Sequence, residues 1–503
     1  MSDPANANHP EDRERQVREL LSSMFGERVD EVMAQMRSAG VDPASMLGDG
    51  PLPTTLQMQA AMRQFQQIMV GAGEGPVNAQ LAENVARQTA VMGGDPAVTG
   101  AQDKEVAEAM SIAELWLDAV TNYLPCDGPA RAWSRSQWVE ATLPAWHALV
   151  APVAASMSEA MASVLAGEDR DGESSLADGD PLKDIEAGLL QSGDLEGFKR
   201  LNEDLASPSS VGSPSLPGMD LLGLGNLSPV GLMRRLGAAA FGMQVGQAAG
   251  NLSREVFGTT DLGLPLLESP GTALLPANIA AFARGLDTPL PEVRLYLAVR
   301  EAAHARLFTH VPWLRRHLLS LVEQYASGID INHEALGDQM RGVDSSDPSA
   351  LHRALSGGGL FNLTQTPQQQ ATLLRLETAL ALVEGWVDEV SAQAALPHLP
   401  NSVPLREMLR RRRASGGPAE RTFANLVGLE LRPRRSRDAA TLFTHVYISG
   451  GVEARDAVWS HPDLLPEPAD LDDPAGYLAR REARRLADTE IDQALERLLS
   501  GDA

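Results

Sequence analysis

The chain has 503 residues, a formal net charge of −25 and one cysteine, Cys126. Its length predicts one large domain or two to three moderate ones, with enough apolar residues for a core. The negative charge opposes broad attraction to nucleic-acid phosphates or anionic lipid, so we expect neither as a partner. A single cysteine excludes an internal disulfide framework and a thiolate zinc cluster, so any metal would be held by His, Asp or Glu.

The N-terminal residues resemble no targeting segment. They lack the basic and apolar regions of a signal peptide, and no later apolar run is long enough to cross a bilayer. We therefore expect a cytoplasmic protein, whose oligomeric state the sequence leaves open.

The first half of the chain is predicted to be helical. A helical, partly flexible segment is expected over residues 1–75, followed by a helical region over 76–205. The strongest amphipathic helices of that region are predicted at 103–123 and 136–165. A stretch rich in Ser, Pro and Gly over 206–229 predicts a linker or loop.

The second half is expected to form a domain over residues 230–466, followed by a helical C-terminal tail over 467–503. At its start, Gly242, Gly246 and Gly250 recur every fourth residue on a helical pattern. Arginine and glutamine side chains interrupt this helix, so the glycines predict close packing in a soluble bundle rather than a membrane dimer.

Strand-like alternation is scarce. The candidates are residues 273–279 and 441–449, which could form a small sheet edge. The coarse prediction is a mainly α fold with minor β structure.

A predicted helix over residues 291–311 carries the most informative motif. Arg300-Glu301-Ala-Ala-His304 is the H-E-x-x-H zinc pattern with its first position changed. In that pattern two imidazoles four residues apart reach one ion, and the intervening glutamate activates a water molecule. Arg300 removes one ligand and places a permanent cation near the position of the metal.

A second predicted helix, over residues 368–395, presents carboxylates on one face. Glu377, Glu384 and Asp388 are seven and four residues apart on a strongly apolar helix. Carboxylates on such a face need a partner. Glu384 and Asp388 also fit the E-x-x-x-D spacing that supplies a third ligand and an orienting acid in thermolysin-like zincins.

Together these segments resemble a family of bacterial zincin-like hydrolases. The resemblance is carried by Arg-Glu-Ala-Ala-His-Ala-Arg-Leu-Phe from Arg300, by Leu-Val-Glu-Gly-Trp-Val-Asp-Glu-Val around Glu384, and by the arginine-rich segment downstream. It spans roughly Pro76 to Pro466. Some members of the family are labelled zinc-dependent metalloproteases, and others are associated by name with deazaflavin-cofactor biosynthesis.

The resemblance implies roles for four residues. Glu301 would be the general base, His304 a zinc ligand, Glu384 the third ligand, and Asp388 a carboxylate that orients a ligand. The family pattern has histidine where this sequence has Arg300, and a second-element histidine at the position of Trp386.

Three more side chains belong to the candidate site. His310 has the spacing of a third histidine ligand, although Leu307 stands where that longer pattern needs a turn-forming glycine. Trp386 and Trp313 could line the cleft, or belong to the core.

Two functional hypotheses remain open. The first is a zinc-dependent peptide hydrolase with Glu301 as base and His304 and Glu384 as ligands. The second is a pseudoenzyme without a metal, in which Arg300 pairs with Glu384 or Asp388 and the chain binds a peptide or protein partner. A two-metal bundle ranks last, because the sequence lacks a second Glu-x-x-His.

Overall fold

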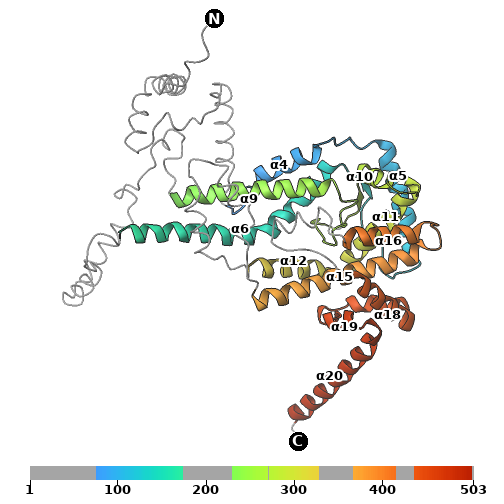
Figure 1. Ribbon diagram of the computed structural model, residues 1–503. Helices are drawn as coiled ribbons and strands as arrows, with labels where there is room; N and C mark the ends of the chain where they lie inside the picture. Colours follow the sequence, from blue (N-terminus) through green and yellow to red (C-terminus); the bar gives the residue numbers. More distant parts are fainter. Residues whose placement is uncertain (1–74, 174–228, 270, 328–365, 415–434, 501–503) are drawn as a thin grey trace. The chain divides into compact units, whose positions relative to one another are not determined.

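The computed structural model describes residues 75–173, 229–269, 271–327, 366–414 and 435–500 (Figure 1). The chain divides into two units, and the candidate site lies in the second. The first unit comprises Met1–Gly71, Ser158–Gly237 and His333–Gly357, and the second comprises Ala72–Met157, Ala238–Asn332 and Gly358–Ala503.

The described residues are mainly α-helical, as the sequence predicted. None of their helices is both long and apolar enough to cross a membrane. Short 3₁₀ turns occupy Ala457–Trp459, Pro462–Leu464 and Pro474–Gly476. The helices are α4 (Ala79–Val91), α5 (Gly100–Asp118), α6 (Arg135–Glu173), α9 (Pro229–Ser253), α10 (Pro276–Ala283), α11 (Leu290–His310), α12 (Pro312–Ser327), α15 (Pro367–Ala395), α16 (Ser402–Ala414), α18 (Ser436–Asp456), α19 (Pro468–Asp472) and α20 (Tyr477–Ser500).

The strand prediction for residues 273–279 is only partly right. Strand β2 covers Ala273–Leu274 alone and pairs in parallel with β1 (Arg131–Ala132). Pro276 then begins α10, because proline suits the first turn of a helix and the alanine-rich residues after it favour helix.

The strand prediction for residues 441–449 is wrong, because this segment lies inside α18. Its β-branched residues suggested a strand, but the buried positions Leu442, Phe443 and Val446 follow helical spacing. Packing of this face against α15 determines the structure, and it overrides a weak local preference.

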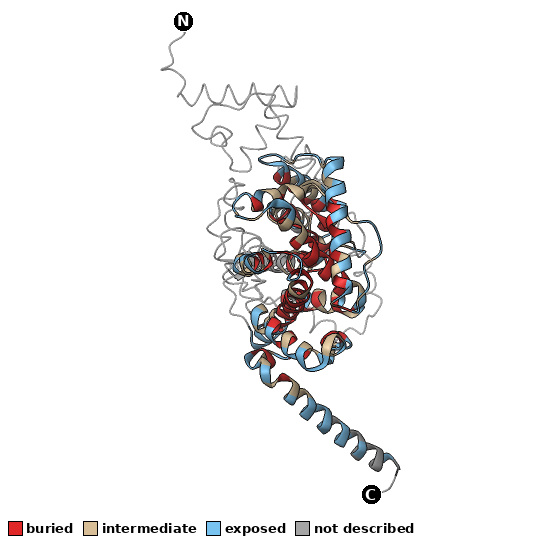
Figure 2. Cartoon of the chain, turned by 90° about the vertical axis from the view of Figure 1, so that its right-hand side faces the viewer, coloured by how far each residue is buried: buried red, intermediate tan, exposed pale blue. Residues whose placement is uncertain are grey.

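Helices α11 and α15 pack against each other in the interior of the second unit. Helix α11 has a proline in its first turn, and a capping box between Thr366 and Gln369 begins α15. Both helices are buried along most of their length, and buried residues gather in the centre of Figure 2. The predicted ranges 291–311 and 368–395 for these helices agree with the structure.

The glycine-rich face of α9 packs closely against α4, as the spacing predicted. A Cβ atom at Gly242 would meet the carbonyl oxygen of Asn78 at 2.5 Å, and one at Gly246 would meet that of Ala82 at 2.5 Å. Glycine is required there because any side chain would force the two helices apart.

Several predictions fall outside the described residues. The N-terminal segment over 1–75, except Gly75, and the linker over 206–229, except Pro229, belong to this group. In the C-terminal tail, α20 forms the predicted helix, and most of its described side chains are exposed.

Candidate functional site

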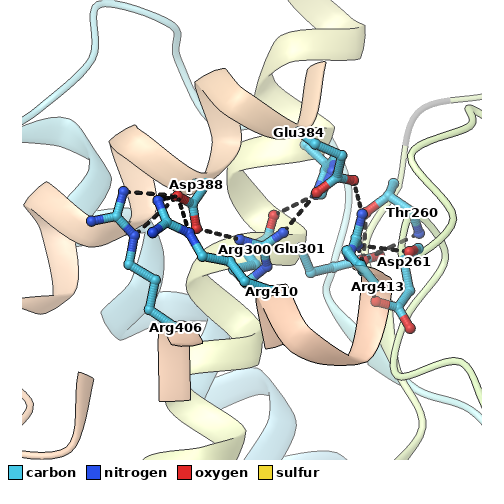
Figure 3. Close-up of polar contacts among 10 residues, drawn as sticks. Thr260, Asp261, Arg300, Glu301, Glu384, Asp388, Arg406, Arg410 and Arg413 are labelled. Carbon is cyan, nitrogen blue, oxygen red and sulfur yellow. Dashed lines mark hydrogen bonds and ion pairs between the residues drawn. The ribbon is translucent and has the colours of Figure 1, made fainter. Parts of the chain in front are cut away.

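The candidate site lies where α11 faces α15. Arg300 of α11 reaches both carboxylates of α15: its Nη2 lies 2.9 Å from Oε2 of Glu384, and its Nη1 lies 3.6 Å from Oδ1 of Asp388 (Figure 3). All three side chains are less than a tenth exposed. The two segments that the sequence analysis placed together therefore meet in the structure.

His304 contacts the same carboxylate one helical turn later. Its Nε2 lies 3.0 Å from Oε1 of Glu384, and its Nδ1 lies 2.9 Å from the carbonyl oxygen of Arg300. Both partners are acceptors, so both contacts are hydrogen bonds when the ring carries a proton on each nitrogen.

A second guanidinium reaches Glu384 from α16. The guanidinium of Arg413 contacts Oε1 of Glu384 and also donates to the carbonyl oxygen of Asp261 over 2.7 Å. Burial acts to raise the pKa of Glu384, but the charges of Arg413, His304 and Arg300 outweigh it and leave that pKa well below its usual range. Glu384 is therefore a fixed anion.

Asp388 is surrounded in a similar way. Arg406 donates to its Oδ2 from Nε and Nη2 over 3.0 and 2.7 Å, and Arg410 donates to the same oxygen. Burial raises the pKa of Asp388, whereas the hydrogen bond from Arg406 and the charges of Arg300, Arg406 and Arg410 lower it, and the net shift is downward.

Glu301 points elsewhere, into a short loop after α9 that we call the site loop (residues 254–264). The backbone N–H of Thr259 donates to Oε1 over 2.9 Å and that of Thr260 donates to Oε2 over 3.2 Å. The hydroxyl of Thr260 donates to Oε2 over 2.6 Å, and the hydroxyl of Thr259 donates to Oε1. The carboxylate thus accepts four hydrogen bonds.

These four hydrogen bonds and the burial of Glu301 determine what chemistry its carboxylate can perform. Burial raises the pKa of Glu301 above its ordinary value, although the hydrogen bonds from Thr259 and Thr260 act in the opposite direction. A general base needs a free lone pair within reach of the proton that it removes. The oxygens of Glu301 instead hold the site loop.

Two glycines let the site loop approach the carboxylates. A Cβ atom at Gly258 would overlap the carboxylate of Glu301, with Cδ at 2.7 Å. Gly263 has a φ of +69°, and a Cβ atom there would lie 3.1 Å from Oε1 of Glu384. Gly258 is required by close contact, and Gly263 by its left-handed backbone as well.

The remaining predicted site residues lie outside this cluster. His310 is exposed; its Nε2 lies 2.9 Å from the carbonyl oxygen of Leu124, and its ring stacks on Tyr123. Trp386, for which the sequence left a cleft or a core position open, is fully buried in the core, where its indole donates to Asp456. Trp313 is half-buried and donates to the carbonyl oxygen of Trp459.

The sequence analysis used the arginine-rich segment only as part of the family resemblance, but three of its arginines, on α16, enter the site. Arg406, Arg410 and Arg413 have the i, i+4, i+7 spacing of one helix face. That spacing, together with the buried carboxylates on α15 that needed partners, could have indicated from the sequence that these arginines enter the site. For the threonines of the site loop we find no comparable signal.

The side chains at this position do not fit a zinc ion. Catalytic zinc takes three protein ligands and a water molecule, and the candidate donors here are His304 and Glu384. Both oxygens of Glu384 already contact the permanently charged guanidinium groups of Arg300 and Arg413. Within the described part of the chain, no three His, Cys, Asp or Glu side chains are grouped to hold a metal.

The protein is mainly helical, and its helix α11 carries a pattern like the H-E-x-x-H zinc motif. In this pattern Arg300 stands where the motif has its first metal-binding histidine. The profile of the zincin-like metallopeptidase family matches residues 77–478, which is most of the chain. The chain therefore belongs to the zincin-like metallopeptidase family.

A solved structure supports the fold. The chain is similar to the crystal structure of a "putative hydrolase with a novel fold" from Chloroflexus aurantiacus, with a TM-score of 0.50 and 16% sequence identity. The match covers 81% of this chain and 99% of the other. At this identity the likeness concerns the fold alone. No curated protein matches the sequence.

Proposed function

We propose that this chain is a member of the zincin-like family that has lost zinc catalysis and acts by binding a peptide or protein partner. The observation that carries the proposal is the buried ion pair of Arg300 with Glu384, at 2.9 Å. A guanidinium at this position supplies positive charge to the α15 carboxylates, which is the electrostatic role of a metal ion.

The surroundings of the motif support the same proposal. Glu301, the residue that would activate water in a zincin, is saturated by hydrogen bonds from Thr259 and Thr260. Arg413 further occupies the carboxylate that would be the third ligand. Each group that catalysis would need has a fixed structural partner.

The alternative function is zinc-dependent peptide hydrolysis. One observation favours it besides the family: His304 and Glu384, the two candidate ligands, converge to 3.0 Å. It requires that Arg300 and Arg413 leave Glu384 when zinc binds. Moving two guanidinium groups out of a buried cluster is costly, so we prefer the first function.

Zinc analysis of the purified full-length chain distinguishes the two. The protein would be loaded with zinc, freed of unbound metal and measured by mass spectrometry beside Arg300→His. We expect much less than one zinc ion per wild-type chain, and about one per variant chain, because the variant has two imidazoles four residues apart.

The variant Arg300→His with His304→Ala is the matched control and should lose the zinc again. A wild-type protein that binds about one zinc ion per chain and loses it in His304→Ala would refute the proposal. Hydrolysis of a fluorogenic peptide library by wild type, abolished in Glu301→Gln, would refute it independently.

A further inference from the structure

A pocket lies beside the site loop, outside the Arg300 cluster. Its interior volume is about 50 Å³, or about 400 Å³ when the open solvent at its mouth is included, and residues of α11, α12 and the segment after α9 line it. Leu266, Leu267 and Phe308 make much of its wall apolar. Thr259 and Thr260 also line it, so the pocket shares a wall with the enclosure of Glu301.

Arg315 of α12 lines this pocket and has no partner among the residues that the structure describes. Its Nε is buried and makes no hydrogen bond, and among the described residues Arg315 forms no ion pair. Arg315 as a whole is half-buried, whereas the fully buried arginines have partners: Arg306 contacts Glu114 and Asp118, and Arg455 contacts Asp456. A buried donor without an acceptor costs stability, so the Nε of Arg315 indicates an acceptor supplied by a ligand.

The charge around Arg315 leaves room for an anion. Among the residues lining the pocket, the only carboxylate is that of Glu268, and this residue is exposed, so water and salt screen its charge. A guanidinium offers a planar pair of donors that matches a carboxylate in two hydrogen bonds.

We propose that this pocket binds an aliphatic carboxylate. The apolar part of the ligand lies against Leu266, Leu267 and Phe308, and its carboxylate accepts hydrogen bonds from Arg315. Pockets of this composition use an apolar wall for affinity and a few polar groups for orientation. The C-terminal leucine of a peptide and a free branched-chain acid share this chemistry.

This site does not depend on the proposed function. Arg315 takes no part in the contacts of Arg300, Glu384 and Asp388, so the pocket would bind its ligand whether or not the family motif holds zinc.

Calorimetric titration of the full chain tests the proposal. The probes are an acetylated hexapeptide ending in Ala-Leu with a free carboxylate, the same peptide amidated, N-acetyl-leucine and 4-methylpentanoate. Amidation should weaken binding about tenfold or more, because it removes a charge-assisted hydrogen bond. Arg315→Gln should produce a similar loss for the free acid.

Two further variants control the experiment. Arg316→Gln changes an exposed arginine on the same helix and should leave binding unchanged. Leu267→Ala reduces the apolar wall and should weaken binding several-fold while the charge stays in place. Because Arg315 loses no contact to any described side chain, the melting temperature of Arg315→Gln should match that of wild type.

Each outcome decides the proposal. Binding of the free peptide but not of the two small acids identifies a peptide C-terminus as the ligand, and binding of the small acids but not of the peptide identifies a free acid. Equal affinity for the acid and the amide, equal loss in Arg315→Gln and Arg316→Gln, or no binding of any probe would overturn it.

Discussion

Arg300 and His304, one helical turn apart on α11, each contact a different oxygen of Glu384 on α15. A metal ion in a zincin draws two side chains with the same spacing to a single point. Here the carboxylate is that point, and the two side chains approach it as hydrogen-bond donors. These contacts link α11 to α15.

The ion pair between Arg300 and Glu384 should contribute strongly to stability. Because removing one partner leaves a buried charge, we expect Arg300→Met to lower the free energy of unfolding by about 3 kcal/mol. Glu384→Gln should also destabilise, and the double variant should lose less than the sum, with a coupling of about 2 kcal/mol. Urea unfolding of all four proteins measures this.

The control for this double-mutant experiment is the exposed ion pair of Arg87 with Glu83 on α4. Both side chains are nearly half exposed, so Arg87→Met should cost less than about 0.5 kcal/mol. Additive effects of Arg300→Met and Glu384→Gln would contradict the coupling.

The lowered pKa of Glu384 predicts how its contribution depends on pH. A carboxyl whose pKa is lower in the folded state stabilises the fold above its unfolded pKa, which is about 4.3, and that stabilisation decreases as the pH falls towards the folded pKa. The difference in stability between wild type and Glu384→Gln should therefore be constant near neutral pH and shrink below about pH 4. A difference that grows on acidification would refute this assignment.

Much of the site follows from the sequence, and the rest depends on tertiary contacts. Helical spacing located both motif helices, and the replacement of a ligand by Arg300 indicated an ion pair that the structure contains. The partners of Glu301 could not be inferred, because Thr259 and Thr260 lie over forty residues away in a loop without a motif. Trp386 belongs to the core because residues 378–391 of α15 are all buried, which periodicity alone does not reveal.

The hydrogen bonds of Glu301 predict a second pH dependence of the stability, opposite in sign to that of Glu384. The pKa of Glu301 is raised, so its ionisation costs stability as the pH rises through the folded pKa. Thr260→Val removes a hydroxyl that favours the charged form, so the pKa of Glu301 should rise further, with a loss of about 2 kcal/mol once Glu301 is ionised.

Comparison over a pH range tests this assignment. The cost of Thr260→Val should grow as the pH rises through the raised pKa of Glu301. Thr260→Ser keeps the hydroxyl and should show little of that trend. A cost that is the same at every pH would mean that the hydroxyl serves packing rather than the charge of Glu301.

Gly385, the residue after Glu384, predicts how strictly α15 must approach α18. A Cβ atom there would lie 2.5 Å from Cβ of Ala439 and 2.7 Å from the backbone nitrogen of Ala440. Alanine favours helix over glycine, but the overlap with α18 backbone should dominate and cost about 2 kcal/mol.

Gly100→Ala is the matched control: that glycine begins α5, a Cβ atom there meets no atom within 4 Å, and the variant should be neutral or stabilised by about 0.5 kcal/mol. Thermal unfolding of both variants provides the measurement. Equal stability of the two would show that α15 and α18 can separate freely, and Glu384 would then not be held as rigidly as its ion pairs require.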